Sequence, residues 1–162
     1  MRNERWSEMN NNDRLTRLRY ALNIKDADMV EIFKMGGVTL SRKDIQKLLN
    51  KQDDAYELEL SHEYLERFLN GLITSQRGVR DGFEPQMELN EENANNLLLK
   101  KVKIALSLTS EDMLELLSEA GVEISKSELS AVLRKEGHRN YKPCGDRYVR
   151  NFLKGLTLRY RA

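Results

Sequence analysis

The stretch HEYLERFLNGL at residues 62–72 recurs 84 residues later as DRYVRNFLKGL at residues 146–156. The same offset aligns residues 12–78 with residues 96–162 without a gap. Of these 67 aligned pairs 18 are identical, where composition alone would give about four. The chain is therefore predicted to be an internal duplication in which both copies contain the same elements.

Each copy is predicted to contain four helices, because its apolar residues recur three and four positions apart. In the first copy, helices are expected at 12–22, at 26–35, from near 42, and at 61–77. In the second copy, the corresponding helices are expected at 95–107, at 110–120, from near 126, and at 146–161. The third pair begins at capping boxes, Ser41-x-x-Asp44 and Ser125-x-x-Glu128, whose side chains bond the free amides of the first turn. The predicted fold class is all-α, with two tandem four-helix repeats packed together about a pseudo-twofold axis.

Glycines occupy the same places in both copies. Gly37 and Gly121 are expected to end the second helices, because glycine tolerates a left-handed backbone. Gly71 and Gly155 lie inside the fourth helices, where glycine costs roughly 1 kcal/mol relative to alanine. A close helix–helix crossing is the favoured explanation for this second pair, and a ligand approaching the backbone is the alternative.

The domain boundaries follow from the duplication. Residues 1–9 lie outside it and are expected to form a disordered tail, with Trp6 either idle or docked on the body. Residues 10–78 form repeat 1, residues 79–92 a linker rich in acidic residues with one glycine and one proline, and residues 93–162 repeat 2. A unit of this size buries little apolar surface, so we expect the two repeats to depend on each other for stability.

Composition argues against several classes of protein. No apolar run approaches the roughly 18 residues that span a bilayer, and the first residues lack the apolar segment of a signal peptide. The single cysteine, Cys144, cannot form an internal disulfide, so a cytoplasmic location is expected. The glycine-rich phosphate-binding motifs are absent, and two histidines with one cysteine do not give the ligand spacing of a zinc site. No membrane contact, cofactor or metal is therefore predicted.

The formal net charge of +1 is unevenly distributed. Residues 51–92 carry 4 basic and 11 acidic side chains, whereas residues 131–162 carry 9 basic and 2 acidic ones. The sign reverses between the fourth helices, where Glu63, Glu66 and Asn70 align with Arg147, Arg150 and Lys154. Opposed blocks favour a contact between the copies, within one chain or between chains. Tyrosines interleaved with the basic residues keep nucleic-acid binding open, although Tyr148 is expected to lie in the core.

The second and third helices of each copy also invite a helix-turn-helix interpretation. That motif requires a small residue four positions before the turn glycine, where this chain has Phe33 and Leu117, and the turn at residues 36–40 is longer than usual. The basic residues of the third helix, Arg42, Lys43 and Lys47, are therefore expected to form a solvated face, with phosphate contact as the less favoured alternative.

Residues 138–147 contain the one cluster of chemically versatile side chains. A cysteine lies there between histidine and aspartate, which could serve as nucleophile, base and orienting acid. Because Cys144 aligns with Leu60 in the first copy, a structural thiol is favoured over a reactive one, and no residue is predicted to be catalytic. The candidate binding residues are His138, Arg139, Tyr141, Cys144, Asp146, Arg147, Arg150 and Lys154.

Five segments carry a resemblance to a known family: RYALNIKDADMVEIFKMGG (19–37), FLNGLITSQRG (68–78), LKKVKIALSLTSEDML (99–114), HRNYKPCGD (138–146) and GDRYVRNFLKGLTLRY (145–160). Across about residues 12–162 the chain resembles the bacterial YehS-like proteins. The resemblance implies a two-repeat helical protein from a bacterium, and it implies no activity because the family is one of unknown function. Such proteins often have a cysteine in the first copy too, whereas this chain has Leu60, which argues against any role that needs both thiols.

We therefore expect a non-enzymatic cytoplasmic binding or adaptor protein that acts on a macromolecular partner. Another protein or a second copy of this chain is the favoured partner. A nucleic-acid-binding regulator that uses the basic C-terminal face is the alternative, and a cysteine-dependent enzyme is the second alternative.

Overall fold

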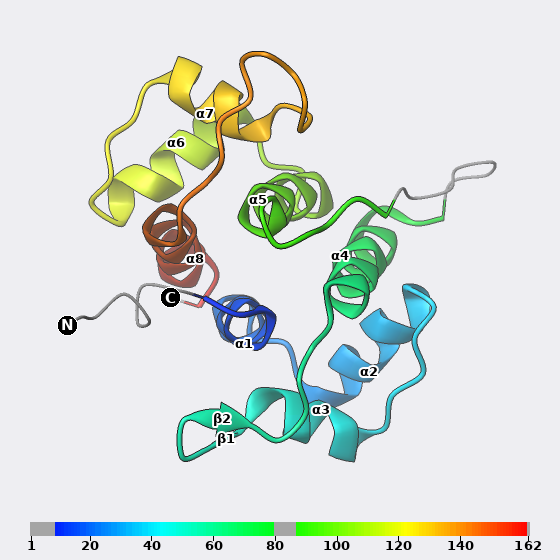
Figure 1. Ribbon diagram of the computed structural model, residues 1–162. Helices are drawn as coiled ribbons and strands as arrows, with labels where there is room; N and C mark the ends of the chain where they lie inside the picture. The colour runs from blue at the N-terminus through cyan, green and yellow to red at the C-terminus, as the bar shows by residue number, and fades with distance from the viewer. Residues whose placement is uncertain (1–8, 80–86, 162) are drawn as a thin grey trace.

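The computed structural model describes residues 9–79 and 87–161, and within them almost all of the regular secondary structure is helical (Figure 1). The helices are α1 (Asn11–Leu22), α2 (Asp26–Met35), α3 (Arg42–Leu49), α4 (His62–Arg77), α5 (Ala94–Ala105), α6 (Ser110–Glu119), α7 (Lys126–Leu133) and α8 (Asp146–Tyr160). A hairpin of two short antiparallel strands, β1 (Lys51–Gln52) and β2 (Ala55–Tyr56), separates α3 from α4. None of the described helices combines the length and apolarity that crossing a membrane requires.

The helix boundaries confirm the signals found in the sequence. Both predicted capping boxes are formed, at Ser41 and Ser125, and two further boxes begin α1 at Asn10 and α6 at Thr109. The glycines expected to end the second helices have φ angles of +92° and +93°. Each helix of repeat 1 begins and ends within one residue of the position equivalent to that of its counterpart in repeat 2, as a duplication requires.

The repeats exchange partners across a pseudo-twofold axis. Within a repeat, α2 packs on α4 and α6 packs on α8. The first helix of each repeat packs chiefly on the fourth helix of the other, so that α1 contacts α8 and α5 contacts α4. Figure 1 shows these four inner helices nearly end-on, around the centre of the molecule. The predicted packing of the repeats about a pseudo-twofold axis is therefore confirmed.

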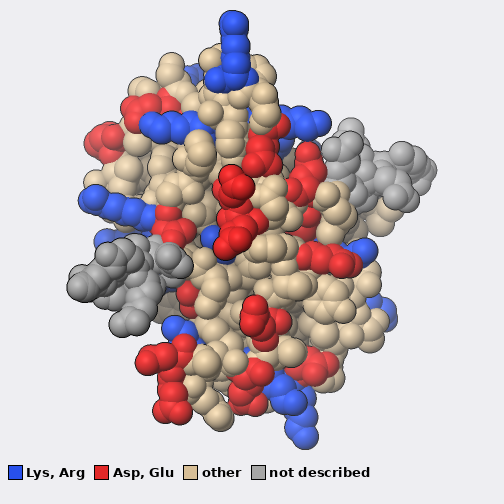
Figure 2. Space-filling model, in the orientation of Figure 1, with Lys and Arg blue, Asp and Glu red and all other residues tan. Residues whose placement is uncertain are grey.

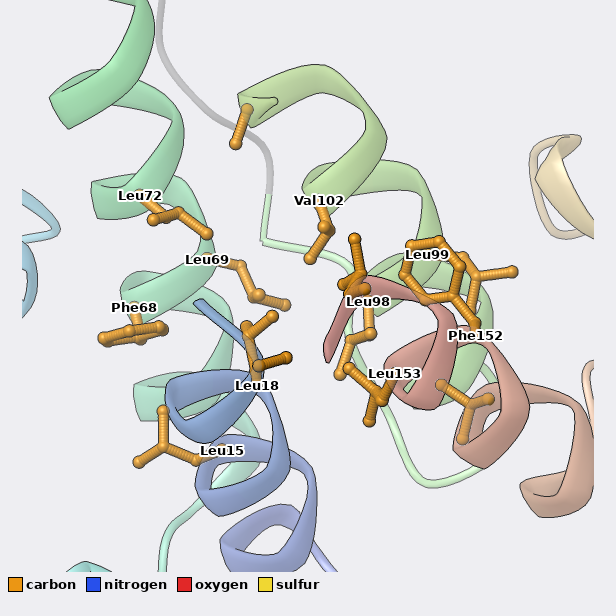
Figure 3. Packing of buried hydrophobic residues seen from close by; sticks show 14 of the residues in the cluster. Leu15, Leu18, Phe68, Leu69, Leu72, Leu98, Leu99, Val102, Phe152 and Leu153 are labelled. Carbon is orange, nitrogen blue, oxygen red and sulfur yellow. The ribbon is translucent and has the colours of Figure 1, made fainter. Parts of the chain in front are cut away.

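A single hydrophobic core runs through both repeats. Figure 3 shows Leu18 and Leu69 of repeat 1 directed toward Leu98 and Leu153 of repeat 2, and each of these leucines is at most 2% exposed. Burying one such side chain stabilises a fold by roughly 1.5–3 kcal/mol. Because each repeat contributes two of these four facing leucines, neither repeat can complete the core alone.

The glycines inside the fourth helices mark close crossings, as predicted. A Cβ atom at Gly71 would collide with the backbone carbonyl oxygen of Ile32 in α2, and one at Gly155 would collide with that of Leu116 in α6. These positions are occupied by neighbouring backbone, so the crossing accounts for glycine at both of them.

Two features differ from the sequence-based expectation. The hairpin was not predicted, since strands of two residues are too short to show alternation. Of the tail and linker, residues 1–8 and 80–86 lie outside the described range, as does Trp6. Met9 is buried, and the amides of Glu88 and Leu89 donate to the Glu66 carboxylate, so the described ends of the tail and linker pack on the body.

Candidate binding site at the repeat junction

A pair of asparagines begins the first helix of each repeat, Asn11-Asn12 in α1 and Asn95-Asn96 in α5. The second member of each pair is buried and makes three hydrogen bonds with the backbone of its own repeat. Asn12 donates to the carbonyls of Leu48 (3.0 Å) and Leu58 (2.8 Å) and accepts from the amide of Leu60 (2.9 Å), and Asn96 makes the same bonds with Val132 (2.9 Å), Lys142 (2.9 Å) and Cys144 (3.0 Å). These bonds fix the segment before the fourth helix against the first helix.

The first members of the pairs, Asn11 and Asn95, meet at one arginine between the repeats. Arg14 Nη1 donates to Asn11 Oδ1 and Arg14 Nε donates to Asn95 Oδ1, both at 2.8 Å. Arg14 Nη2 also lies 3.9 Å from Asp146 Oδ1. The residue that aligns with Arg14 is Leu98, so a single guanidinium serves both repeats.

The guanidinium fixes the orientation of both asparagines, because arginine can only donate. Each Nδ2 must then donate onward: Asn11 to Leu60 O (3.2 Å) and His62 Nδ1 (3.0 Å), and Asn95 to Cys144 O (3.0 Å) and Asp146 Oδ1 (2.8 Å). His62 accepts at Nδ1, so its neutral ring carries the proton on Nε2. A continuous chain of hydrogen bonds therefore joins His62 to Asp146, the equivalent first residues of α4 and α8.

The charges in this hydrogen-bonded chain of side chains are balanced by their immediate neighbours. Burial lowers the pKa of the Arg14 guanidinium, and the nearby Asp146 carboxylate opposes that change. Asp146 also accepts a hydrogen bond from the amide of Met9 at 2.8 Å, and it lies at the N-terminal turn of α8, where the helix dipole favours a negative charge. The buried arginine is therefore held by one carboxylate and two neutral amides contributed by both repeats.

An open cleft of about 940 Å³ lies beside this chain, and we call it the junction cleft. It is lined by Met9, Asn10, Asn11, Asn12, Arg14, Asp54, Ala55, Tyr56, Glu59, Leu60, Ser61, His62, Glu91 and Asp146. Four of these residues are acidic, whereas Arg14 is the one lysine or arginine and its side chain is only 8% exposed. Figure 2 shows Asp and Glu gathered over the middle of this view, with Lys and Arg mostly toward its rim. The cleft is therefore suited to a cationic group.

The hairpin supplies one wall of the junction cleft, and it is anchored to α1. The Tyr56 hydroxyl donates to Asp13 Oδ1 at 2.7 Å, and Lys51 Nζ lies 3.8 Å from the same oxygen. Burial and the hydrogen bond to Asp13 raise the pKa of Tyr56 to about 12, so the hydroxyl keeps its proton at neutral pH. The second repeat has no strand pair at the equivalent described positions, which makes this wall specific to repeat 1.

The structure separates the binding residues predicted from the sequence. Asp146 belongs to the junction cleft, and Cys144 is buried directly behind it. His138 and Arg139 are exposed in the loop between α7 and α8, where His138 Nδ1 accepts from the Asn140 amide at 3.0 Å. Tyr141 lines a separate small cavity of about 90 Å³. The remaining three, Arg147, Arg150 and Lys154, lie along α8, so the eight residues do not form one site.

Cys144 has the surroundings of a structural thiol. It is 5% exposed, and burial, with a smaller contribution from Asp146, raises its pKa to about 12. A nucleophilic cysteine needs the opposite shift, toward the thiolate at neutral pH. His138 is engaged in its own loop, and no described group of three or more His, Cys, Asp and Glu side chains could hold a metal ion. The buried thiol of Cys144 therefore lacks the surroundings of a nucleophile.

Sequence reasoning missed the centre of the site. The paired asparagines are identical in the two copies, and this repeated dipeptide is a signal that could have identified them. Arg14 stands at a position where the other copy has the apolar Leu98. Such a difference indicates a residue that contacts the other repeat as well as its own. His62 carried no signal of its own, since its equivalent is Asp146.

Comparison with known proteins agrees with this architecture. The family model described as "Protein of unknown function (DUF1456)" matches the chain twice, at residues 11–78 and 95–162. The chain is 37% identical over 151 residues to the "Uncharacterized protein YehS" of Escherichia coli, an alignment that covers 93% of this chain and 96% of that protein. No solved structure gives a significant match. The two matched segments coincide with the two structural repeats, and the chain belongs to the DUF1456 family.

Proposed function

We propose that this protein is a non-enzymatic, cytoplasmic adaptor that binds a basic segment of a protein partner in the junction cleft. The observation that carries the proposal is the charge of the lining, where Asp54, Glu59 and Glu91 are exposed and Asp146 is partly exposed. The only lysine or arginine among the lining residues, Arg14, is bonded to amides of both repeats. A Lys- or Arg-rich segment therefore complements the cleft, and an anionic one does not.

The form of the cleft favours a polypeptide over a small molecule. Sites for small molecules are mostly apolar and enclose most of the ligand surface. The junction cleft is open to solvent and mainly polar, and its volume of about 940 Å³ accommodates several side chains. Backbone and side-chain donors of an extended peptide could donate hydrogen bonds to the carboxylates of the cleft. His62 Nε2 offers a donor to a peptide carbonyl.

The side chains of the hydrogen-bonded chain are engaged with one another, which supports binding over chemistry. The amides of Asn11 and Asn95 use their donors and acceptors within the hydrogen-bonded chain. The Asp146 carboxylate accepts hydrogen bonds from the Met9 amide and from Asn95. The side chains of the hydrogen-bonded chain thus hold the wall of the cleft in place, and the exposed carboxylates remain to contact a partner.

The test is the affinity of the full chain for a fluorescein-labelled octa-arginine peptide, with octa-glutamate as the opposite probe. Octa-arginine should bind, and binding should weaken as salt is raised because the contacts are exposed ion pairs. Replacing three lining carboxylates, Asp54→Asn with Glu59→Gln and Glu91→Gln, should weaken binding about tenfold, since exposed pairs contribute about 0.2–1 kcal/mol each.

The matched control carries the same change in net charge at exposed carboxylates outside the cleft lining, Asp28→Asn with Glu31→Gln and Glu123→Gln. This variant should bind octa-arginine within about twofold of the unaltered chain. Equal weakening in both variants would show that net charge alone attracts the peptide. Preference for octa-glutamate would contradict the proposal outright.

A further inference from the structure

The pseudo-twofold axis relates two helix pairs, α5 with α4 and α1 with α8, and we call each pair a seam. The ends of the seams carry the same contact. Arg77 Nη1 donates to Ile104 O (3.4 Å) and Ser107 Oγ (2.7 Å), and Arg161 Nη1 donates to the equivalent Tyr20 O (3.1 Å) and Asn23 Oδ1 (2.9 Å). Positions 84 residues apart therefore occupy equivalent places along the two seams.

The α5–α4 seam holds a neutralised cation. Lys101 Nζ donates to Asn70 Oδ1 at 2.5 Å and lies 3.5 Å from Glu66 Oε2. Glu66 is 1% exposed, and it also accepts from the amides of Glu88 and Leu89 at 2.8 Å each. Charge and hydrogen bonding at this seam are satisfied by the chain itself.

The α1–α8 seam has only cations at the equivalent positions. Arg17 takes the place of Lys101, Arg150 that of Glu66, and Lys154 that of Asn70. Arg147 lies one turn before Arg150, where α4 has Glu63. The α8 residues are spaced three and four apart, so they share one face of the helix. Arg17, Arg147 and Lys154 are exposed, and we call these three residues the basic seam, whereas the partly exposed Arg150 is engaged within the protein.

Aromatic rings lie at the C-terminal ends of the same two helices. Tyr20 of α1 is 54% exposed and Tyr160 of α8 is 41% exposed. The Arg161 guanidinium lies 4.1 Å from the centre of the Tyr20 ring and donates to the Tyr20 carbonyl, which holds the ring at this end of the seam. Exposed rings beside a row of cations form the combination that binds unpaired bases and their phosphates.

We propose that the basic seam binds single-stranded nucleic acid, with its three cations on successive phosphates and a base stacked on Tyr20. A single strand fits better than a duplex, because a duplex offers phosphates but no free base face to a tyrosine. A polypeptide with acidic side chains would use the cations but gain nothing from the rings. This surface is separate from the acidic junction cleft, so nucleic-acid binding can be tested independently of the adaptor function proposed above.

The test is fluorescence-anisotropy binding of the full chain to a labelled oligothymidylate of about 20 nucleotides and to a duplex of the same length, between about 50 and 300 mM salt. The single strand should bind more tightly than the duplex. Three phosphate contacts predict a slope of about −2 for the logarithm of the binding constant against that of salt concentration. The variant Arg17→Gln with Arg147→Gln and Lys154→Gln should lower affinity about tenfold or more and bring the slope close to zero.

The control with the same charge change uses the exposed cations of α3, Arg42→Gln with Lys43→Gln and Lys47→Gln. It should leave the affinity within about twofold and the slope unaltered. Circular dichroism should show equal helix content for all variants. Loss of binding in the α3 variant would place the contact on the helix-turn-helix-like face instead, and would overturn the proposal.

The stacking contact is tested at Tyr20 alone. Tyr20→Ala should weaken binding of the single strand roughly tenfold without altering the salt slope, because stacking involves no phosphate. Tyr20→Phe keeps the ring and should restore the affinity. Tighter binding of the duplex, absence of binding at about 50 mM salt, or an Ala variant that binds normally would each overturn the proposal.

Discussion

At the scale of single residues, buried polar side chains define this molecule as much as its leucines do. Asn12 and Asn96 are at most 4% exposed, and each satisfies one carbonyl near the end of the third helix and one carbonyl and one amide of the segment before the fourth helix. A buried amide of this kind contributes little net energy while it is paired, but its loss leaves several backbone groups without partners. We therefore expect these asparagines to be intolerant of replacement.

The variant Asn96→Ala should lower the free energy of unfolding by about 2–4 kcal/mol, because two carbonyls and one amide lose their partner in a buried place. Asn12→Ala should cost a similar amount, since the bonds are duplicated. Exposed Asn50→Ala serves as the control and should change stability by less than about 1 kcal/mol. Urea denaturation followed by circular dichroism measures all three, and a neutral Asn96→Ala would show that the loop does not depend on this side chain.

Cys144 predicts a dependence of stability on alkaline pH. The folded protein raises the pKa of the thiol from 9.0 to about 12, so folding favours the protonated form. This contribution is complete below pH 9.0 and is lost as the pH rises toward about 12. Wild type should therefore lose more stability than Cys144→Ala between these values. Thiol labelling should be slow at neutral pH and become fast in denaturant, and rapid labelling of the native chain would contradict a structural role.

At the scale of helices, backbone contacts determine how the outer helices pack on the fourth ones. Gly71 and Gly155 allow α2 and α6 to approach so closely that the carbonyl of the neighbouring helix occupies the place of a side chain. Alanine is the better helix former by about 1 kcal/mol, but overpacking against a rigid carbonyl costs about 1–3 kcal/mol. Packing therefore outweighs helix propensity at these crossings.

Gly71→Ala should accordingly destabilise the protein by roughly 2 kcal/mol, in spite of its favourable helix propensity. Gly145→Ala is a suitable control, because a Cβ there meets nothing within 4 Å and the backbone φ is −76°. It should change stability by less than about 1 kcal/mol. Thermal unfolding of the two variants side by side decides the matter, and a stabilised Gly71→Ala would disprove the close crossing.

The helices could be predicted from the sequence, whereas the centre of the site could not. Capping boxes and apolar spacing act within a few residues, so the signals at Ser41 and Ser125 lie in the sequence itself. The hydrogen-bonded chain that joins His62 to Asp146 depends on a contact between residues more than 80 positions apart, Arg14 with Asn95. The hairpin was missed because its turn depends on one residue, Asp53, with a φ of +57°, and not on an extended pattern.

At the scale of the whole molecule, the exchange of partners between repeats makes two small units into one body. The α5–α4 seam adds a buried ion pair, Glu66 with Lys101, to the shared apolar layer. Burial lowers the pKa of Lys101, and Glu66 opposes that change. Because desolvation offsets most of the attraction, such a pair fixes which helices meet more than it stabilises them. At the equivalent positions the α1–α8 seam has three basic residues, Arg17, Arg150 and Lys154.

Glu66→Gln should therefore destabilise the protein by about 3–5 kcal/mol, since Lys101 would keep a buried charge without its carboxylate. The double variant Glu66→Leu with Lys101→Met should recover most of that loss, because apolar side chains of similar size suit the same place. A double-mutant cycle in urea measures the coupling. Simple additivity of the two single changes would show that the pair does not act as a unit.

The junction cleft is tested most directly by nuclear magnetic resonance of the full chain during titration with octa-arginine. The predicted result is that amide shifts change at the start of α1, at the hairpin and at Glu59–His62, together with the side-chain amides of Asn11 and Asn95. These side chains report on the hydrogen-bonded chain behind the cleft, so they should respond although they are buried. Shifts spread over unrelated acidic surfaces such as α6, with Asn11 and Asn95 unchanged, would contradict a binding site at the junction of the repeats.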